Sequence, residues 1–567
     1  MKIKCVFGDN FHDITSGQIK LIGDGLDRGK KQLIIVPDRY SLTMEKRVLR
    51  ELNLKATFDI DVVSFARLAN KVLTRVQAPQ ILSSLGATMV IEMLLTIHER
   101  ELVCFRNTAK TIAFASVLFD SIAQLKSCKI TPIDLEKNID NLRNSALRLK
   151  LKDIALIYKY YEEFLSTQYM DSNNRLQLLG KEIADGQDFE DCDIHICQFD
   201  NITEQGLDLI KILVQKANSI SVGLLFPNKE QNNKECYTKE LANYILPLAE
   251  NLNTTSDYIE VPNTLPQFSK HILDNLMSIK PDTAEITPNN LNIYSASNVN
   301  SEVEWIAKDI LQKIKQGARF NEVVLNCASL ENYAPVIKRI FDKYNIPFWA
   351  DLPFKLADSE GAKYLFTALD CVQDNFQVKD VLRFAKNSLT GLSLQDFAIF
   401  ENVIKKYGIV GTRFMDATKP EFPDAEFDKY LEIKAFMQPL FTLAKNIQGS
   451  ITIAEMISAI HNFFEETELR DNLSGMAQSF EEQGDLLKQS IARQNFDKLD
   501  AVLRQMQEIL GQMELSFDNF CKIFRAGVAT VTISPLPMSV DCVYVGQSLQ
   551  SVFSRAPYYY IVGAVEG

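Results

Sequence analysis

The first stretch that could do chemistry is a predicted strand, loop and helix at the start of the chain. Gly8 and Thr15 have the spacing of the phosphate-binding loop G-x-x-x-x-G-K-[ST], whose backbone N–H groups, lysine and hydroxyl hold phosphates and Mg²⁺. Asp13 stands where this loop has its second glycine, and Ile14 stands where it has its lysine. A carboxylate repels phosphates, and isoleucine cannot bind one. We therefore predict a degenerate nucleotide site at Gly8, Asp13, Ile14 and Thr15.

The second half of such a site would follow a later strand, predicted at residues 192–197. There an ATP-hydrolysing protein carries one acid that holds Mg²⁺ and another group that orients the attacking water. Cys197 and Gln198 occupy these positions, and Asp200 is interpreted as a turn residue before a helix near Thr203. Because both parts of the nucleotide site lack their functional residues, we predict the fold of an ATP-driven motor protein without ATP hydrolysis. No catalytic residue and no metal ligand is predicted on this chain.

The charge is distributed unevenly along the 567 residues. The chain has 61 Lys and Arg against 73 Asp and Glu, a net charge of −12. Residues 1–75 hold 14 of the basic residues and nine acids, so they carry +5 while the remainder carries −17. A basic segment on an acidic body indicates a polyanion partner, although solvated helix faces explain it equally well.

The spacing of the cysteines and the hydropathy of the chain indicate the cellular compartment of the protein. The ten cysteines form no C-x-x-C pair, and the five histidines offer no zinc spacing. The start of the chain is too short an apolar run for a signal peptide, and no stretch approaches 18 uninterrupted apolar residues. We predict a cytoplasmic protein without a membrane partner.

The elements that must position these residues form an α/β pattern with a helical interruption. Short apolar runs predict strands, and the 3.6-residue periodicity between them predicts helices. This alternation predicts a parallel sheet with right-handed crossovers. From about residue 80 to 185 only amphipathic helices are predicted. The expected strands are 2–7, 32–36, 59–63, 192–197 and 219–226, and the expected helices are 14–27, 41–51, one from 65, and 203–217.

The second half of the chain repeats this α/β pattern with a helical interruption. A helix is predicted to open with a capping box at Ser301 and Glu304 and to end before Gly317, and another is predicted over 330–344. A second helical block fills 376–525. The expected strands are 290–295, 322–325, 346–349, 530–533, 542–545 and 558–562.

The predicted fold class is α/β, with two RecA-like parallel-sheet domains, each interrupted by a mainly helical insertion. This is the plan of superfamily 1 helicases. The first domain would comprise 1–80 and 186–285 with its insertion at 81–185. The second would comprise 286–375 and 526–567 with its insertion at 376–525.

Several segments resemble the AddB/RexB family, the B subunits of bacterial AddAB and RexAB helicase–nucleases. The phrase Phe199-Asp-Asn-Ile-Thr203 is similar to the family's G-F-x-x-F-T segment, and Tyr560-Ile-Val-Gly-Ala-Val-Glu-Gly567 to its G-x-N-E-G segment. The other matching segments are Val36-Pro-Asp-Arg-Tyr-Ser-Leu-Thr-Met-Glu-Lys46, Val62–Leu73, Asn298–Ile310 and Phe320–Asp351.

This resemblance implies a non-motor subunit of a heterodimer that processes double-strand DNA ends for homologous recombination. An AddA/RexA-type partner would hydrolyse ATP with Mg²⁺, while this chain would hold single-stranded DNA and scan it for a Chi-like sequence. The family's nuclease domain, with its iron–sulfur cluster, has no counterpart in these residues. The resemblance thus implies a chain truncated before that domain, with no cofactor of its own.

The family's DNA-contact positions fall on Arg39, Ser41, Phe65, Arg67 and Asn70. Arg67 and Phe65 match the family pattern, whereas Arg39 and Asn70 replace Gln and Trp, so no particular Chi sequence is predicted. Arginine and phenylalanine suit single strands, because guanidinium groups hold phosphates and aromatic faces stack on bases. Without the resemblance, Phe65 would be interpreted as a core residue and Arg67 as a solvated one.

Two alternatives to a DNA-binding subunit stay open. One is a protein-interaction scaffold built on the helical blocks, with no contact to DNA. The other is an active ATP-dependent helicase, which would need the missing lysine and acidic pair.

Overall fold

A computed structural model describes most of the chain: residues 2–8, 13–74, 79–111, 113–139, 142–186, 189–225, 239–251, 255–261, 267–276, 280–283, 290–350, 352–415, 425–533, 541–547 and 556–565. The chain forms two compact units. The first unit contains residues 1–81, 123–131 and 165–295, and the second contains 82–122, 132–164 and 296–567. The predicted loop residues 9–12 and the last two residues of the Tyr560–Gly567 segment lie outside the described part.

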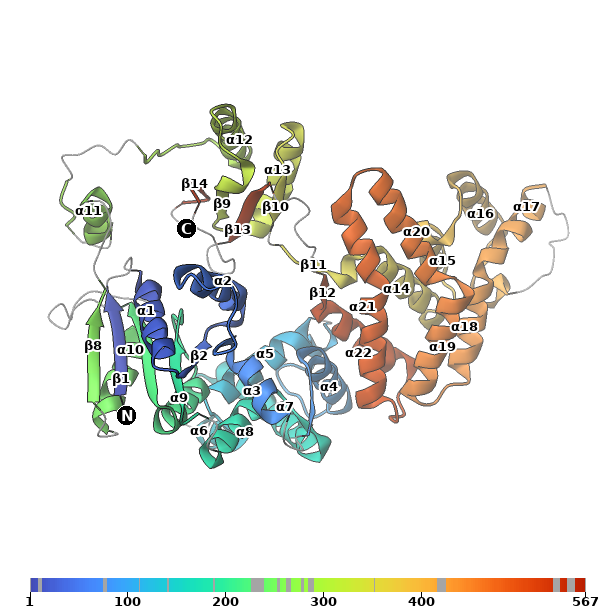
Figure 1. The fold of residues 1–567 in the computed structure, drawn as a ribbon. Coiled ribbons are helices and arrows are strands. Elements are labelled where there is room, and N and C mark those ends of the chain that lie inside the picture. Colours follow the sequence, from blue (N-terminus) through green and yellow to red (C-terminus); the bar gives the residue numbers. More distant parts are fainter. Residues whose placement is uncertain are drawn as a thin grey trace. The chain divides into compact units, whose positions relative to one another are not determined.

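A six-stranded parallel sheet organises the first unit, which confirms the predicted α/β class. Its strand order is β3-β2-β6-β7-β1-β8, and all its described pairings are parallel (Figure 1). The five expected strands agree with the structure to within one residue at every described end, and the sequence analysis missed β8. The strands are β1 (Lys2–Gly8), β2 (Lys31–Ile35), β3 (Ile60–Val63), β6 (Cys192–Ile196), β7 (Ser219–Leu225) and β8 (Thr255–Glu260).

Helices cover both faces of this sheet, as a parallel sheet with buried strands requires. On one face, α1 (Ile14–Asp27) and α2 (Ser41–Glu51) pack on β2 through Ile22, Met44 and Ile34. The opposite face carries a larger apolar cluster that includes Ile35, Leu68 and Ile210. Its helices are α3 (Phe65–Leu73), α8 (Ser172–Asp185), α9 (Glu204–Lys216) and α10 (Lys239–Asn251). The unit also contains α11 (Gln267–Leu276) and the short pair β4 (Gln80–Ile81) and β5 (Tyr169–Met170).

A smaller parallel sheet, of order β10-β13-β9-β14, lies in the second unit. Helices α12 (Val299–Lys315) and α13 (Leu330–Lys343) pack on it through Ile306, Ile337 and Val545. Its strands are β9 (Val323–Cys327), β10 (Phe348–Ala350), β13 (Val543–Gln547) and β14 (Tyr558–Val562). The expected strand over 530–533 instead forms β12 (Thr532–Ile533), which pairs antiparallel with β11 (Phe354–Lys355).

Two predictions for residues 290–304 were wrong. The stretch 290–295 forms no strand, and Ile293 is 93% exposed, because none of the described strands pairs with it. The helix expected from Ser301 begins earlier in the chain. Its N-cap is Asn298, whose side-chain oxygen accepts a 2.9 Å hydrogen bond from the backbone N–H of Ser301. The preference of Asn for the N-cap outweighs the S-x-x-E pattern that follows it.

The rest of the second unit is helical. Helix α4 (Ser84–Ile97) packs closely against α22 (Phe517–Thr530), where a Cβ at Gly527 would overlap the side chain of Met89. The helices α5 (Phe114–Ser127) and α7 (Ser145–Gln168) each contribute residues to both units. The other helices are α6 (Pro132–Ile139), α14 (Glu360–Gln373), α15 (Val378–Ala385), α16 (Leu394–Tyr407), α17 (Ala425–Ile433), α18 (Gln438–Gln448), α19 (Ile453–Glu466), α20 (Leu469–Glu482) and α21 (Leu486–Leu510).

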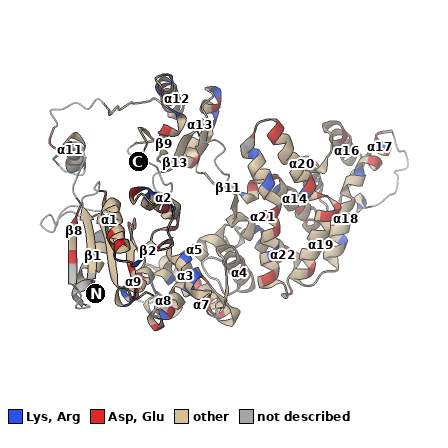
Figure 2. Ribbon diagram, in the orientation of Figure 1, with Lys and Arg blue, Asp and Glu red and all other residues tan. Residues whose placement is uncertain are grey.

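Charge on these helices is mixed in sign. Figure 2 shows basic and acidic residues interspersed over the helices from α14 to α22. None of the helices in the described ranges is both long and apolar enough to span a membrane.

The helix pair α4–α22 contains a buried acid that makes its stability depend on pH. Glu92 is 3% exposed, and its Oε2 has no hydrogen-bond partner among the described residues. Burial raises the pKa of Glu92 to about 7, against a smaller lowering by Lys522. The folded state therefore retains a proton that the unfolded chain releases near pH 4.5. Stability should fall as pH rises from about 4.5 to 7.

We predict that Glu92→Gln stabilises the second unit by about 2–3 kcal/mol above pH 7 and has no effect below pH 4. Both tryptophans, Trp305 and Trp349, lie in this unit, so urea unfolding followed by tryptophan fluorescence reports on it. The control is Glu482→Gln at an exposed position of α20. An equal effect of Glu92→Gln at pH 4 and pH 8 would contradict the assignment.

Candidate functional site

The amino end of α1 follows β1, where a phosphate loop would lead into its helix. Asp13 is the N-cap of α1, and its carboxylate accepts hydrogen bonds from the backbone N–H of Ser16 at 3.3 Å and from the Ser16 hydroxyl at 3.1 Å. A helix amino end attracts anions, because its free N–H groups and its dipole favour negative charge. Here the protein's own carboxylate takes that place.

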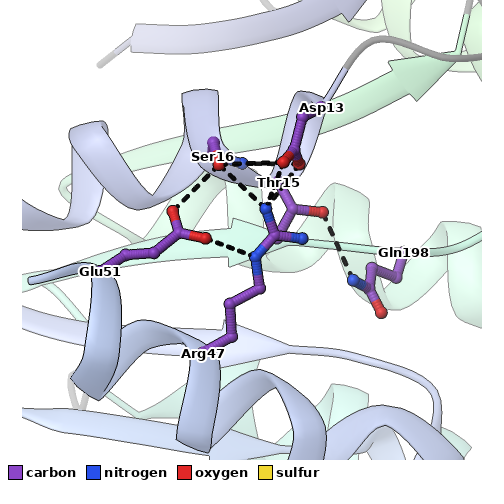
Figure 3. Close-up of polar contacts among 6 residues, drawn as sticks. All are labelled: Asp13, Thr15, Ser16, Arg47, Glu51 and Gln198. Atoms are coloured by element: carbon purple, nitrogen blue, oxygen red, sulfur yellow. Dashed lines mark hydrogen bonds and ion pairs between the residues drawn. The ribbon is translucent and has the colours of Figure 1, made fainter. Parts of the chain in front are cut away.

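Arg47 of α2 supplies the positive charge that faces this carboxylate. Its Nη2 donates to both oxygens of Asp13 at 2.6 Å, and its Nε donates to Glu51 at 2.7 Å (Figure 3). The Ser16 hydroxyl also lies 3.0 Å from Glu51, so its single proton is shared between the carboxylates of Asp13 and Glu51. Burial alone would raise the pKa of Asp13, but the hydrogen bond and charge of Arg47, with the bonds from Ser16, hold it below its usual value. Asp13 therefore stays ionised beside a fully charged arginine.

The second half of the predicted site lies next to the first. Gln198 Nε2 donates to the Thr15 hydroxyl oxygen at 3.4 Å (Figure 3). The backbone of Gln198 is left-handed (φ 60°), a conformation that few residues other than glycine adopt, and it turns the chain at the end of β6. Cys197 is fully buried, and this burial raises the pKa of its thiol, so no thiolate faces the site. The structure thus brings Thr15 and Gln198 together.

This arrangement lacks the groups that magnesium–nucleotide chemistry requires. In a phosphate-loop enzyme the Ser or Thr and an acid after the later strand both hold Mg²⁺. Here the partner of Thr15 is an amide donor, which cannot replace an anionic ligand for a hard cation. Within the described ranges, no three His, Cys, Asp or Glu residues are grouped so that they could hold a metal ion.

A second set of side chains lies where β2 and β6 end. Because the strands are parallel, their carboxyl ends share one edge of the sheet, where ligands of such sheets bind. The Arg39 guanidinium lies 4.0 Å from Asp200 and 5.0 Å from the ring centroid of Tyr40. Ser41 lies beneath this surface: it is 3% exposed and donates a 3.1 Å hydrogen bond to the Asp38 carbonyl.

The start of α3, after β3, contributes aromatic and basic groups to the same edge. Phe65 is half-buried and its ring lies 5.5 Å from that of Phe199, while both rings also pack on the core. Arg67 is exposed, and among the described residues its guanidinium has no partner. Asn70 is exposed, and its side-chain oxygen accepts a hydrogen bond from Arg175 of α8.

The structure therefore brings the predicted residues into two groups. Gly8, Asp13, Ile14, Thr15, Cys197 and Gln198 surround the amino end of α1, and Arg39, Phe65, Arg67 and Asn70 lie at the ends of β2 and β3. Sequence reasoning missed Arg47 and Arg175. The i,i+4 pair Arg47–Glu51 was a visible signal, whereas nothing in the sequence connects Arg175 with Asn70.

These features define a class: a parallel α/β protein in which Asp13 caps the helix after β1 and pairs with Arg47. Residues 11–276 match the family model described as "ADDB, N-terminal". Curated relatives are named as the B subunit of an ATP-dependent helicase/deoxyribonuclease. The chain is 25% identical over 570 residues to the one from Clostridium botulinum (strain Hall), which covers 95% of this chain and 50% of the relative. It is 24% identical over 596 residues to the one from Thermoanaerobacter sp. (strain X514). This match covers 100% of this chain and 52% of the relative.

Together with the quoted motifs, these matches make the chain similar to the AddB family over most of its length. The chain spans about half the length of the curated relatives it matches.

The Asp13–Arg47 pair predicts an acid-sensitive contribution to the stability of the first unit. Arg47→Gln would leave two carboxylates facing each other, so we expect a loss of about 1–3 kcal/mol at neutral pH. The pKa of Asp13 is lowered from 3.8, so the contribution is complete above about pH 4 and disappears as pH falls further. Lys46→Gln, at an exposed neighbouring position, is the control.

Calorimetry measures this effect, because the first unit contains no tryptophan. A difference between wild type and Arg47→Gln that persists unchanged at pH 2 would contradict the assigned pair.

Proposed function

We propose that this chain is the non-motor, DNA-binding part of a two-subunit helicase–nuclease that processes double-strand DNA ends for homologous recombination. In this complex it holds single-stranded DNA, while an AddA/RexA-type partner hydrolyses ATP. The proposal rests on the similarity to the AddB family and on one observation: in the described part of the chain, Arg67 has no partner and follows, on the same first turn of α3, the Phe65 whose ring contacts Phe199. Scanning for a Chi-like sequence would take place at the same edge.

The position of Arg67 favours the binding of an anionic ligand. Arg67 lies in the first turn of α3, and Ser64 caps this helix by accepting a hydrogen bond from the backbone N–H of Arg67. A cation in the first turn is disfavoured by the helix dipole, so the residue does not stabilise the helix. The free guanidinium and the helix dipole both attract a phosphate. The half-buried Phe65–Phe199 pair, at the start of the same helix, offers a stacking surface for a base.

The two parallel sheets support a helicase-like plan. We assign each sheet to a RecA-like domain, the first with the closed position around Asp13 and the second with β9, β10, β13 and β14. Strand β7 alone separates β1, which leads to Asp13, from β6, which leads to Gln198. The ends of β1 and β6 thus lie close to the amino end of α1, where Asp13 pairs with Arg47.

An active helicase is the weaker alternative. The nucleotide position contains a carboxylate in place of a phosphate and an amide in place of a metal-binding acid. ATP chemistry is therefore assigned to the partner. No particular contact favours the alternative of a protein-interaction scaffold. That alternative also gives Arg67 no role.

We predict that the chain binds oligo(dT) with an affinity that falls as salt rises, and that Arg67→Ala weakens binding roughly tenfold. In Arg67→Ala, the magnitude of the slope of log affinity against log salt should decrease by about 0.7, because one phosphate contact is removed. The matched control is Lys211→Ala, an exposed residue of α9 with no partner among the described residues. Fluorescence anisotropy at several salt concentrations measures both quantities. Binding that does not depend on salt, or equal effects of the two variants, would favour the scaffold.

Phe65 tests the stacking part of the proposal separately. Phe65→Leu keeps an apolar side chain against the core but removes the aromatic face, so affinity should fall about 5- to 100-fold with an unchanged salt slope. A loss of the salt slope instead would indicate that the substitution disturbs the charged groups of this edge. Unchanged affinity at an unchanged melting temperature would place Phe65 in the core alone.

A further inference from the structure

Arg175 of α8 is a cation that neither the motifs nor the family positions point to. Its Nη2 donates a hydrogen bond to the side-chain oxygen of Asn70 on α3, so the guanidinium lies against the outer face of that helix. The residue is half-buried, and its Nε is shielded from solvent without a hydrogen-bond partner among the described residues.

No carboxylate neutralises this guanidinium within the described part of the chain. Its one partner there is a neutral amide. Asp171, one turn away at the start of α8, is engaged elsewhere: it caps the helix and pairs with Lys126 at 2.6 Å. Burial lowers the pKa of Arg175, and no nearby acid raises it again. A desolvated cation without a counter-charge is costly to the folded protein and is a suitable place for an anion.

The same face of α3 carries Arg67. Residues three apart on a helix are neighbours on its surface, so Arg67 and Asn70 lie one above the other. Both are exposed, and the hydrogen bond from Arg175 fixes the third group beside them. Arg67 and Asn70 thus share one exposed face of α3, and Arg175 reaches this face from α8 through its contact with Asn70. The nearest other charges on this helix and strand, Lys71 and Asp61, form an ion pair with each other.

We propose that Arg175, together with Arg67 and Asn70, forms a binding site for a phosphate group of the single-stranded DNA backbone. Arg175 is held by Asn70 and donates to the phosphate oxygens from the α8 side, while Arg67 donates from α3. Planar guanidinium groups match phosphate geometry and form strong charge-assisted hydrogen bonds. This inference rests on the proposed function for the identity of the ligand, but the site itself predicts binding of phosphate.

The first test measures DNA binding of the whole chain. Arg175→Gln should reduce the slope of log affinity against log salt by about 0.7. It should weaken the binding of oligo(dT) and of an abasic oligonucleotide of equal length by the same factor. Arg175→Lys should keep the slope, because the charge remains. Lys181→Gln, on another face of α8, is the control and should leave the slope unchanged.

Asn70→Ala provides a second variant at an exposed position that does not endanger folding. It removes the group that orients the guanidinium but leaves the charge, so affinity should fall about two- to threefold at an unchanged slope. A purely structural contact between α3 and α8 would change the melting temperature and leave DNA affinity as it was.

The second test uses inorganic phosphate and does not depend on DNA. Phosphate should raise the melting temperature of the wild type above that in chloride at equal ionic strength, and it should not do so for Arg175→Gln. If the wild type binds oligo(dT) but Arg175→Gln changes neither the slope nor the phosphate response, the phosphate site is wrong and the proposed function stands. If phosphate stabilisation depends on Arg175 but no oligonucleotide binds, the site takes free phosphate, and both the DNA assignment and the proposed function fail.

Discussion

The described strands of the first sheet run parallel, and this constraint positions the residues of the candidate site. The carboxyl ends of these strands therefore meet at one edge, and the described segments that follow β2, β3 and β6 contribute to it. The loop after β1 leads to Asp13, the turn after β2 carries Arg39, Phe65 follows β3, and Gln198 follows β6. Residues from distant parts of the chain thus come to a common surface. No local feature of the sequence could bring them there.

At this edge, an ion pair lies at the amino end of α1, where a nucleotide enzyme binds phosphate. The amino end of α1 attracts an anion in either case. A phosphate-loop enzyme leaves the position open and supplies a lysine, whereas here Asp13 fills it and Arg47 reaches across from α2 to neutralise the carboxylate. The pair satisfies the helix end and occupies the phosphate position at once. Two other cations of the edge, Arg67 and Arg175, have no acid among the described residues and stay available to a polyanion.

Much of this arrangement could be predicted from the sequence, and the parts that could not have physical reasons. Apolar runs and helical periodicity found the strands and helices around the site, because these patterns record burial on both faces of the sheet. Two lost motif positions, Asp13 and Ile14, led to the prediction of a degenerate nucleotide site. The stretch 290–295 has a strand-like pattern but pairs with none of the described strands, since strand formation depends on pairing that a single segment does not encode. The contacts Arg47–Asp13 and Arg175–Asn70 join distant segments and appear only in the fold.

The central claim is that this chain binds single-stranded DNA without using a nucleotide. The most direct measurement is the affinity for fluorescent oligo(dT) over a range of salt concentrations, with and without millimolar Mg-ATP. The account predicts a salt-dependent affinity that ATP leaves unchanged at every salt concentration. An affinity that ATP alters, or no salt-dependent binding at all, would contradict it.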